Sequence, residues 1–116
     1  MQIAFRETSA FTSALKEYFG SDEHYRLLQN RLAENPTLGR VVPGIGPIRK
    51  CRHADPRRGK GTRSGLRVLY IYVPEANYIG MLDVYDKDEA EDLSAQEKSA
   101  LKKIADKFRQ DLLTSI

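Results

Sequence analysis

The residues with the clearest chemical character in this chain are basic, and they lie together. Between Arg40 and Arg67 there are nine basic residues and one acid, Asp55, which is a local net charge of +8, whereas the whole chain of 116 residues carries +3. Such a concentration of cations suggests a polyanionic partner. Three glycines interrupt the run at positions 59–65, and a flexible backbone lets successive side chains reach successive phosphates. The sequence therefore predicts contact with nucleic acid, against the alternative of an ordinary solvated surface.

If the partner is RNA, the same residues could cleave it without a metal. The 2′-OH would act as the nucleophile, so the site needs a base near that oxygen, cations against the charge that develops on the phosphate, and an acid for the departing 5′ oxygen. A lysine among other cations has a lowered pKa and can transfer a proton, whereas an arginine remains charged and stabilises the transition state. The candidates for these roles are Lys60, Arg63, Arg67 and Lys87. Tyr85 offers a ring on which an extruded base could stack, although strand packing is the plainer explanation for it.

Arg67 stands out among the candidates because it lies within the most apolar stretch of the chain, residues 66–73. A guanidinium in such a strand is costly unless it is paired or faces a polar cleft. The structural alternative is an ion pair with Asp86 or Asp88, which flank Lys87. The alternative for Lys87 is an ordinary surface lysine.

Metal, nucleotide and thiol chemistry fit the sequence poorly. His24 and His53 are far apart and have no clustered ligands beside them, so no zinc site is predicted. The acidic residues after position 82 lack the spacing and the glycine of a calcium-binding loop. Residues 59–62 are no Walker loop, because they lead into a strand. Cys51 has no base placed near it and is predicted to be a buried structural thiol. We therefore expect neither a metal nor a cofactor.

The bulk composition is that of an ordinary globular protein, with 41% hydrophobic and 30% charged residues. The longest apolar run, residues 68–73, is far shorter than the roughly 20 residues of a membrane helix. The first residues do not have the charged and then apolar pattern of a secretory signal, and a single cysteine cannot form an internal disulfide. We expect a cytoplasmic protein with one domain over residues 1–116 and no membrane partner.

Hydrophobic periodicity places the basic run in an α+β fold. Residues 2–6 read as a short strand, and Thr8 can cap a helix whose apolar stripe continues to Phe19. A second helix begins at Ser21 and is stopped by the Asn-Pro pair at positions 35–36. The short link between the two helices predicts an antiparallel pair.

Three strands are expected next. Residues 49–53 form the first, with a bulge or one irregular pairing because Ile48 and Cys51 break strict alternation. Residues 66–73 are apolar on both faces, which predicts a central strand covered on each side. A turn then leads to its hairpin partner at residues 78–85.

The chain is expected to end in a helix. Ser94 and Glu97 have the spacing of a capping box, which opens a helix at this point. Its predicted core-facing stripe consists of Leu101, Ile104, Ala105, Phe108 and Leu112. The expected order of elements is β-α-α-β-β-β-α.

The combination ADPRRGKGTRSGLRVLYIYV followed by YDKDEAEDL resembles bacterial type II toxins of the RelE/HigB superfamily, and most closely the HigB-type branch. The likeness covers nearly the whole chain. It implies a small, twisted, mainly antiparallel sheet with two N-terminal helices on one face and a C-terminal helix. It also implies a ribosome-dependent endoribonuclease that cuts mRNA in the A site of the 30S subunit without a metal. A cognate antitoxin with a DNA-binding domain would restrain it.

The resemblance also implies roles for individual residues. Arg67 matches the strand arginine that contacts the scissile phosphate, Lys60 and Arg63 match basic-loop positions, and Lys87 matches the cation that ends the last strand. Contacts to mRNA or rRNA are expected from Arg49, Lys50, Arg52, Arg57, Arg58 and Tyr85. The final helix has no tyrosine or histidine of the kind that many relatives use, so the acid and the base stay open. Asp83, an acid in the last strand, is placed to pair with Arg67.

Two other functions stay open. The first is a basic binding module that occupies rRNA or mRNA and blocks translation without cutting. The second is a toxin of the ParE type, which inhibits DNA gyrase. Under each of the three functions, the +8 run predicts that an antitoxin places acidic groups or steric bulk over this surface.

Overall fold

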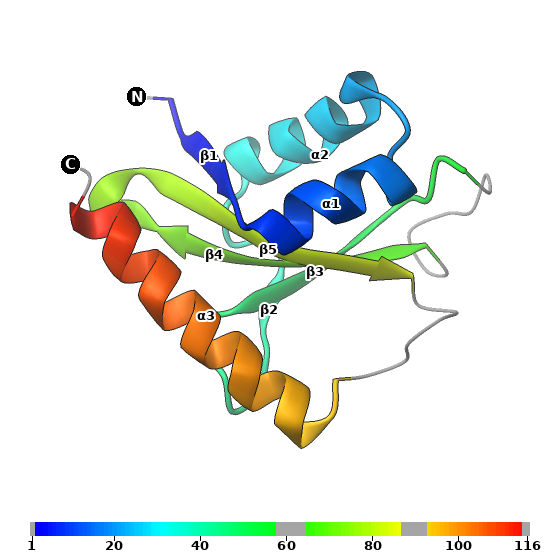
Figure 1. Ribbon diagram of the computed structural model, residues 1–116. Coiled ribbons are helices and arrows are strands. Elements are labelled where there is room, and N and C mark those ends of the chain that lie inside the picture. Colours follow the sequence, from blue (N-terminus) through cyan, green and yellow to red (C-terminus); the bar gives the residue numbers. More distant parts are fainter. Residues whose placement is uncertain (1, 58–64, 87–92, 115–116) are drawn as a thin grey trace.

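The computed structural model describes residues 2–57, 65–86 and 93–114, and these residues form one mixed five-stranded sheet with α-helices on both faces (Figure 1). The strands are β1 (Ala4–Glu7), β2 (Arg40–Val41), β3 (Arg49–His53), β4 (Leu66–Val73) and β5 (Tyr78–Asp86). The α-helices are α1 (Ser9–Tyr18), α2 (Asp22–Glu34) and α3 (Ala95–Thr114). The strand order is β1-β5-β4-β3-β2, in which β1 runs parallel to β5 and all other neighbours are antiparallel. The predicted α+β class is confirmed.

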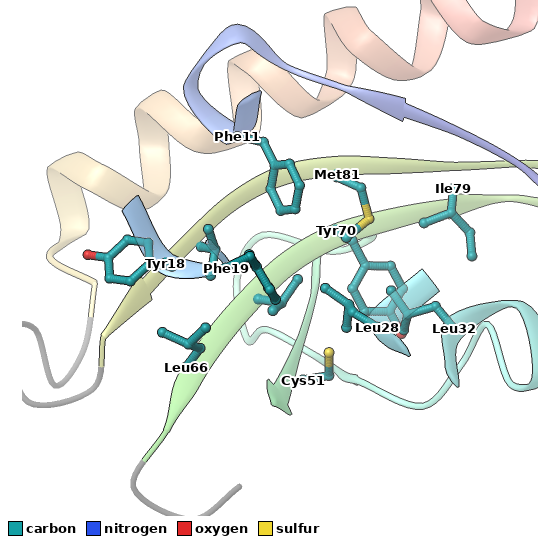
Figure 2. Close-up of a cluster of buried hydrophobic side chains, with 12 residues drawn as sticks. Phe11, Tyr18, Phe19, Leu28, Leu32, Cys51, Leu66, Tyr70, Ile79 and Met81 are labelled. Carbon is teal, nitrogen blue, oxygen red and sulfur yellow. The ribbon is translucent and has the colours of Figure 1, made fainter. Parts of the chain in front are cut away.

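Strand β4 supplies both hydrophobic cores because its side chains alternate between the two faces of the sheet. Val68 and Tyr70 face the layer of α1 and α2, whereas Leu69, Ile71 and Val73 face α3. Figure 2 shows the first of these cores, which also takes in residues of both N-terminal helices and of β5. Seven of the eight residues of β4 are buried, so the prediction of a central strand covered on each side is confirmed.

Each of the three α-helices begins next to the capping residue that was predicted for it. The Thr8 hydroxyl accepts a hydrogen bond from the Phe11 N–H and donates one to the Leu82 carbonyl, which joins the start of α1 to β5. Ser21 caps α2. The backbone N–H of Ser94 donates to the Glu97 carboxylate, and the Glu97 N–H donates to the Ser94 hydroxyl. This reciprocal pair confirms the capping box. Within the described ranges, none of the helices combines the length and the hydropathy that a membrane span requires.

The sheet irregularity lies between β4 and β5, and the predicted bulge next to Cys51 is wrong. Strand β3 pairs with β4 in continuous register over its whole length. Ile48 and Cys51 belong to different cores on opposite faces, and both are buried because both faces are covered. The actual bulge is in β5, where Asp83 is opposite Leu69 and Met81 is opposite the next residue, so that Leu82 is the extra residue.

Two further details differ from the prediction. The two-residue edge strand β2 was not predicted, because a strand this short has no periodicity to detect. In α3, Ala105 and Leu112 are buried, but Ile104 is 50% exposed, so the predicted stripe is wrong at that position. The helix therefore packs on the sheet through a narrower face than the sequence suggested.

Candidate nucleic-acid-binding site

Three side chains with potential roles in RNA binding form a row across strands β3, β4 and β5, one residue from the start of β4 and one residue from the ends of β3 and β5. Arg67 of β4 is paired with Arg52 of β3 on one side and with Tyr85 of β5 on the other. Directly opposite residues have Cβ atoms about 5 Å apart. The alternation along β4 places this row on the face that carries α3. Both residues of α3 that are fully buried, Ala105 and Leu112, belong to the second half of that helix.

Arg67 is almost completely buried, with an exposed fraction of 5%. One of its guanidinium nitrogens donates to the Leu66 carbonyl at 3.3 Å. Burial, and then the charge of Arg52, lowers the pKa of the Arg67 guanidinium, but an arginine begins from a pKa above about 12 and stays charged at neutral pH. A permanent cation is thus held at a desolvated position beside a second cation, where binding of an anion would lower its energy.

The predicted pairing of Asp83 with Arg67 has no support among the described residues. The Asp83 carboxylate accepts a hydrogen bond from the Val84 backbone N–H at 2.8 Å, and burial raises the pKa of this carboxyl. No ion pair within residues 2–57, 65–86 and 93–114 joins the two side chains. Asp86, the other described candidate, is bound by Arg57 at 3.3 Å.

A hollow of about 650 Å³ opens along the edge of β3, next to Arg52 and Arg67. It exists because β2 pairs only with Arg49 and Lys50 and leaves the rest of that edge uncovered by a strand in the described part of the chain. The lining combines cations with aliphatic side chains. It consists of Arg31, Leu38, Arg40, Val41, Val42, Pro43, Lys50, Cys51, Arg52 and Arg67. Five of these ten residues are cations and none is an acid, which makes the hollow a site for anions.

Arg31 is the residue of this site that sequence reasoning missed. It projects from α2, and its Nη1 donates to the Arg52 carbonyl at 3.0 Å and lies 2.6 Å from His53 Nδ1. These contacts join α2 to the exposed edge of β3. Arg31 is 21 positions from Arg52, and the sequence offers only a basic residue in the last turn of a helix. Arg40 was counted in the basic run but was not expected to line the same hollow as Arg67.

The other predicted contact residues divide between the two faces of the sheet. Lys50, Arg52 and Tyr85 lie on the same face as Arg67, and Tyr85 is half-buried against the α3-side core. Arg49 points to the opposite face, where its Nη1 donates to the Gly39 carbonyl at 2.7 Å. Arg57 is also on the side of α1, because its guanidinium lies over the Tyr18 ring at 4.6 Å. The structure therefore brings three of the predicted contacts to Arg67 and holds two away from it. Arg58, Lys60, Arg63 and Lys87 lie outside the described residues.

Thiol and metal chemistry have no geometric support in the described ranges. Cys51 is buried, as predicted, and burial raises the pKa of its thiol to about 11, so it is protonated at neutral pH and is a poor nucleophile. No group of three or more His, Cys, Asp or Glu residues in the described part of the chain is placed to hold a metal.

His53 makes the stability of the protein depend on pH. Burial, and then the positive charge of Arg31, lowers the pKa of His53 to about 4, from about 6.5 in the unfolded chain. The unfolded state thus binds more protons between these values, and stability is lost as the pH falls from 6.5 towards 4. We expect the free energy of unfolding to decrease by about 2 kcal/mol, which is less than the full shift implies because Arg31 can turn partly into solvent.

Urea unfolding at pH 7 and at pH 4.5 measures this effect. The matched variant is His53→Gln, which retains a hydrogen-bond acceptor for Arg31 but does not titrate. It should lose about 2 kcal/mol less than the wild type over the same interval. An identical pH dependence in the two proteins would show that carboxylates, and not His53, are responsible.

The arrangement of the elements first defines a class of fold. A parallel β1–β5 pair, an antiparallel β5-β4-β3-β2 run, two N-terminal helices on one face and a C-terminal helix on the other make up the RelE-like fold. No family model matches the sequence.

Solved structures of the toxin RelE from E. coli share this fold. One is a mutant with two arginines replaced by alanine, in the free state; it is 15% identical to this chain, with a TM-score of 0.53 over 78% of this chain and 90% of that one. Another is the isolated toxin, which is 17% identical, with a TM-score of 0.52 over 88% and 98% of the two chains. At this level of identity the likeness shows the fold, and the expected RelE-like architecture is confirmed.

Proposed function

We propose that this chain is the toxin of a type II toxin–antitoxin system and that it acts in the cytoplasm by cleaving mRNA in the ribosomal A site. The observation that carries the proposal is the position of Arg67, a buried and permanently charged residue in a row with Arg52, at a hollow lined by five cations and no acid. The RelE-like fold supports the same function. The partners are the ribosome, its mRNA, and an antitoxin with a DNA-binding domain.

The proposed reaction uses the RNA as its own nucleophile. The 2′ oxygen forms a bond to the adjacent phosphorus while the bond from phosphorus to the 5′ oxygen breaks, which leaves a 2′,3′-cyclic phosphate and a 5′-OH. A base takes the proton of the 2′-OH, and an acid gives a proton to the departing 5′ oxygen. Arg67 would donate hydrogen bonds to the non-bridging oxygens, where negative charge increases in the transition state. Its burial means that little solvent must be displaced or reorganised during that step.

The remaining cations have supporting roles in this proposal. Lys50 and Arg52 lie on the same strand and face, next to Arg67, and would hold the phosphates that flank the cleaved one. Lys60, Arg63 and Lys87 are proposed for proton transfer and charge stabilisation on the sequence resemblance. The ribosome would hold the message so that the 2′ oxygen is in line with the leaving oxygen, a geometry that phosphate contacts alone do not impose.

Primer extension on a defined message tests the proposal. Purified protein is added to a cell-free translation reaction and, in parallel, to the same message without ribosomes. We expect cuts only on the translated message, with 5′-OH ends downstream. Intact message on arrested ribosomes would instead indicate a binding module that does not cut. Normal translation together with inhibited DNA supercoiling would indicate a gyrase inhibitor.

A further inference from the structure

We infer that the hollow beside Arg67 contains a subsite for a nucleobase, formed by the aliphatic side chains of Leu38 and Val41. This inference rests on the proposed function and extends it, because it gives the protein a direct contact with a base of single-stranded RNA. The adjacent phosphate would lie on Lys50 and Arg52. The hollow lining thus contains both cations for the backbone and exposed apolar side chains for the base.

Leu38 and Val41, the aliphatic residues of the proposed subsite, are unusually exposed for large hydrophobic side chains. The described residues include four large hydrophobic side chains that are exposed, and two of them, Leu38 at 37% and Val41 at 47%, line this one hollow. The other two, Leu27 and Ile104, are on helices and line neither this hollow nor a second one beside α1. Exposed apolar side chains that gather in a concave, charged site are typical of ligand contact.

The loop that carries Leu38 is fixed before any ligand binds. The Gly39 N–H donates to the Tyr70 hydroxyl at 2.9 Å, and that hydroxyl donates to the Pro36 carbonyl at 2.8 Å. A Cβ at Gly39 would lie 2.9 Å from the Lys50 backbone and 2.9 Å from the Tyr70 ring, so only glycine permits this close approach. A preformed rim requires little ordering on binding, which favours affinity.

The chemistry and size of the hollow fit a nucleotide of a single strand. Single-stranded nucleic acids alternate phosphates with flat apolar bases, and sites for them combine a cationic groove with apolar packing surfaces. Lys50 and Arg52 are two residues apart on β3, which separates them by about 7 Å, a spacing suited to neighbouring phosphates. The volume of about 650 Å³ lies within the range of about 300–1,000 Å³ that is common for ligand sites.

An acidic peptide is the competing occupant of the hollow. The small exposed apolar area of Leu38 and Val41 favours a nucleobase over a peptide. A stable protein interface buries about 800 Å² on each partner. Two exposed aliphatic side chains supply a small part of such an area, but they are enough to cover one face of a base. The choice between the two occupants can be tested directly.

The test is a fluorescence anisotropy titration of a labelled single-stranded RNA tetranucleotide, without ribosomes. The rim variant Leu38→Ser/Val41→Ser should bind about tenfold more weakly than the wild type, because it loses apolar surface whose burial against a base contributes about 1.5 kcal/mol. The matched control is Leu27→Ser/Ile104→Ser, which removes two side chains that are more exposed and lie elsewhere, and it should bind like the wild type. With an abasic tetranucleotide, the wild type and the rim variant should bind equally.

Three results would overturn the subsite. They are no saturable binding of the tetranucleotide by the wild type, equal binding by the rim variant, or a rim variant that loses affinity for an acidic peptide but not for RNA. The last would identify a protein-docking surface. Because the titration involves neither ribosomes nor cleavage, it is independent of the primer-extension experiment. Base-dependent binding in the titration, together with an uncut translated message in primer extension, would support the subsite and contradict the proposed nuclease.

Discussion

Replacing Arg67 with glutamine should lower the rate of mRNA cleavage by about 10²–10³-fold, the usual effect of removing one preorganised donor from a transition state. The expectation follows from the proposed function and from the position of the side chain, which is 5% exposed between Arg52 and Tyr85. Arg67→Lys should recover only part of the loss, because an ammonium keeps the charge but lacks the planar fork that binds two phosphate oxygens.

The measurement is single-turnover cleavage on ribosomes stalled with the message in place, read by primer extension. The matched control is Arg109→Gln, which makes the same substitution at an arginine that pairs with Glu75 on the surface at 2.7 Å. That variant should cleave within about twofold of the wild type, because exposed ion pairs contribute at most about 1 kcal/mol. If Arg67→Gln also cleaved within a few-fold of wild type, the assignment of Arg67 to the scissile phosphate would be wrong.

Stability should respond to the Arg67 substitution in a different way from activity. Burial and the charge of Arg52 both disfavour the charged guanidinium, as the lowered pKa of Arg67 indicates. Removing that charge should leave the free energy of unfolding within about 1 kcal/mol of wild type, or raise it. A large loss of cleavage together with unchanged stability is the combination expected of a group placed for function and not for folding.

The parts of this fold that could be predicted are those with local causes. Thr8, Ser21 and Ser94 each cap a helix with their own side chain, so the helix starts depend on a few neighbouring residues. Strand β4 could be predicted from the sequence because a strand that is buried on both faces is a continuous apolar run. These features need no knowledge of the rest of the chain.

The parts that could not be predicted depend on contacts between distant segments. The hydrogen bond from Arg31 to the Arg52 carbonyl joins a helix to a strand edge 21 positions away, and no periodicity marks it. The bulge at Leu82 has a partial signal, because Met81 and Val84 interrupt simple alternation in residues 78–85. Its position does not follow from that signal, because apolar residues are accepted on either face of a sheet that is covered on both sides.

One part of the site could have been predicted better from the sequence. Arg49, Lys50 and Arg52 were expected to act together, but side chains in a strand alternate between faces. Arg49 must therefore point away from Lys50 and Arg52, and the structure places it against Gly39 on the other side of the sheet. The strand prediction was correct, and a strand at residues 49–53 by itself separates Arg49 from Lys50 and Arg52.

Replacing Asp55 with alanine should lower the free energy of unfolding by about 3 kcal/mol, the largest stability effect that we expect for this protein. Asp55 is 1% exposed, and its carboxylate accepts hydrogen bonds from the Arg57 N–H at 3.0 Å, from Nε at 3.2 Å and from Nη2 at 3.0 Å. The same guanidinium binds Asp86, which is completely buried, at 3.3 Å. Losing Asp55 removes these three hydrogen bonds to a buried carboxylate and leaves the exposed Arg57 side chain with Asp86.

Urea unfolding of Asp55→Ala and of Glu75→Ala measures the difference between an ion pair with a buried carboxylate and one in which both partners are exposed. Glu75 is the surface partner of Arg109, and its removal should change stability by less than about 1 kcal/mol. A loss of similar size in both variants would contradict the proposed importance of the buried cluster.

The role of Arg57 follows from the same cluster. It was expected to contact RNA, but its guanidinium joins the segment after β3 to the end of β5, on the face opposite Arg67. Arg57→Ala should therefore reduce stability as Asp55→Ala does, and the two losses should be strongly non-additive because they remove one interaction. At a temperature where both variants are folded, each should bind the RNA tetranucleotide like the wild type. If Arg57→Ala alone weakened RNA binding, the contact surface would have to extend around the end of the sheet to the side of α1.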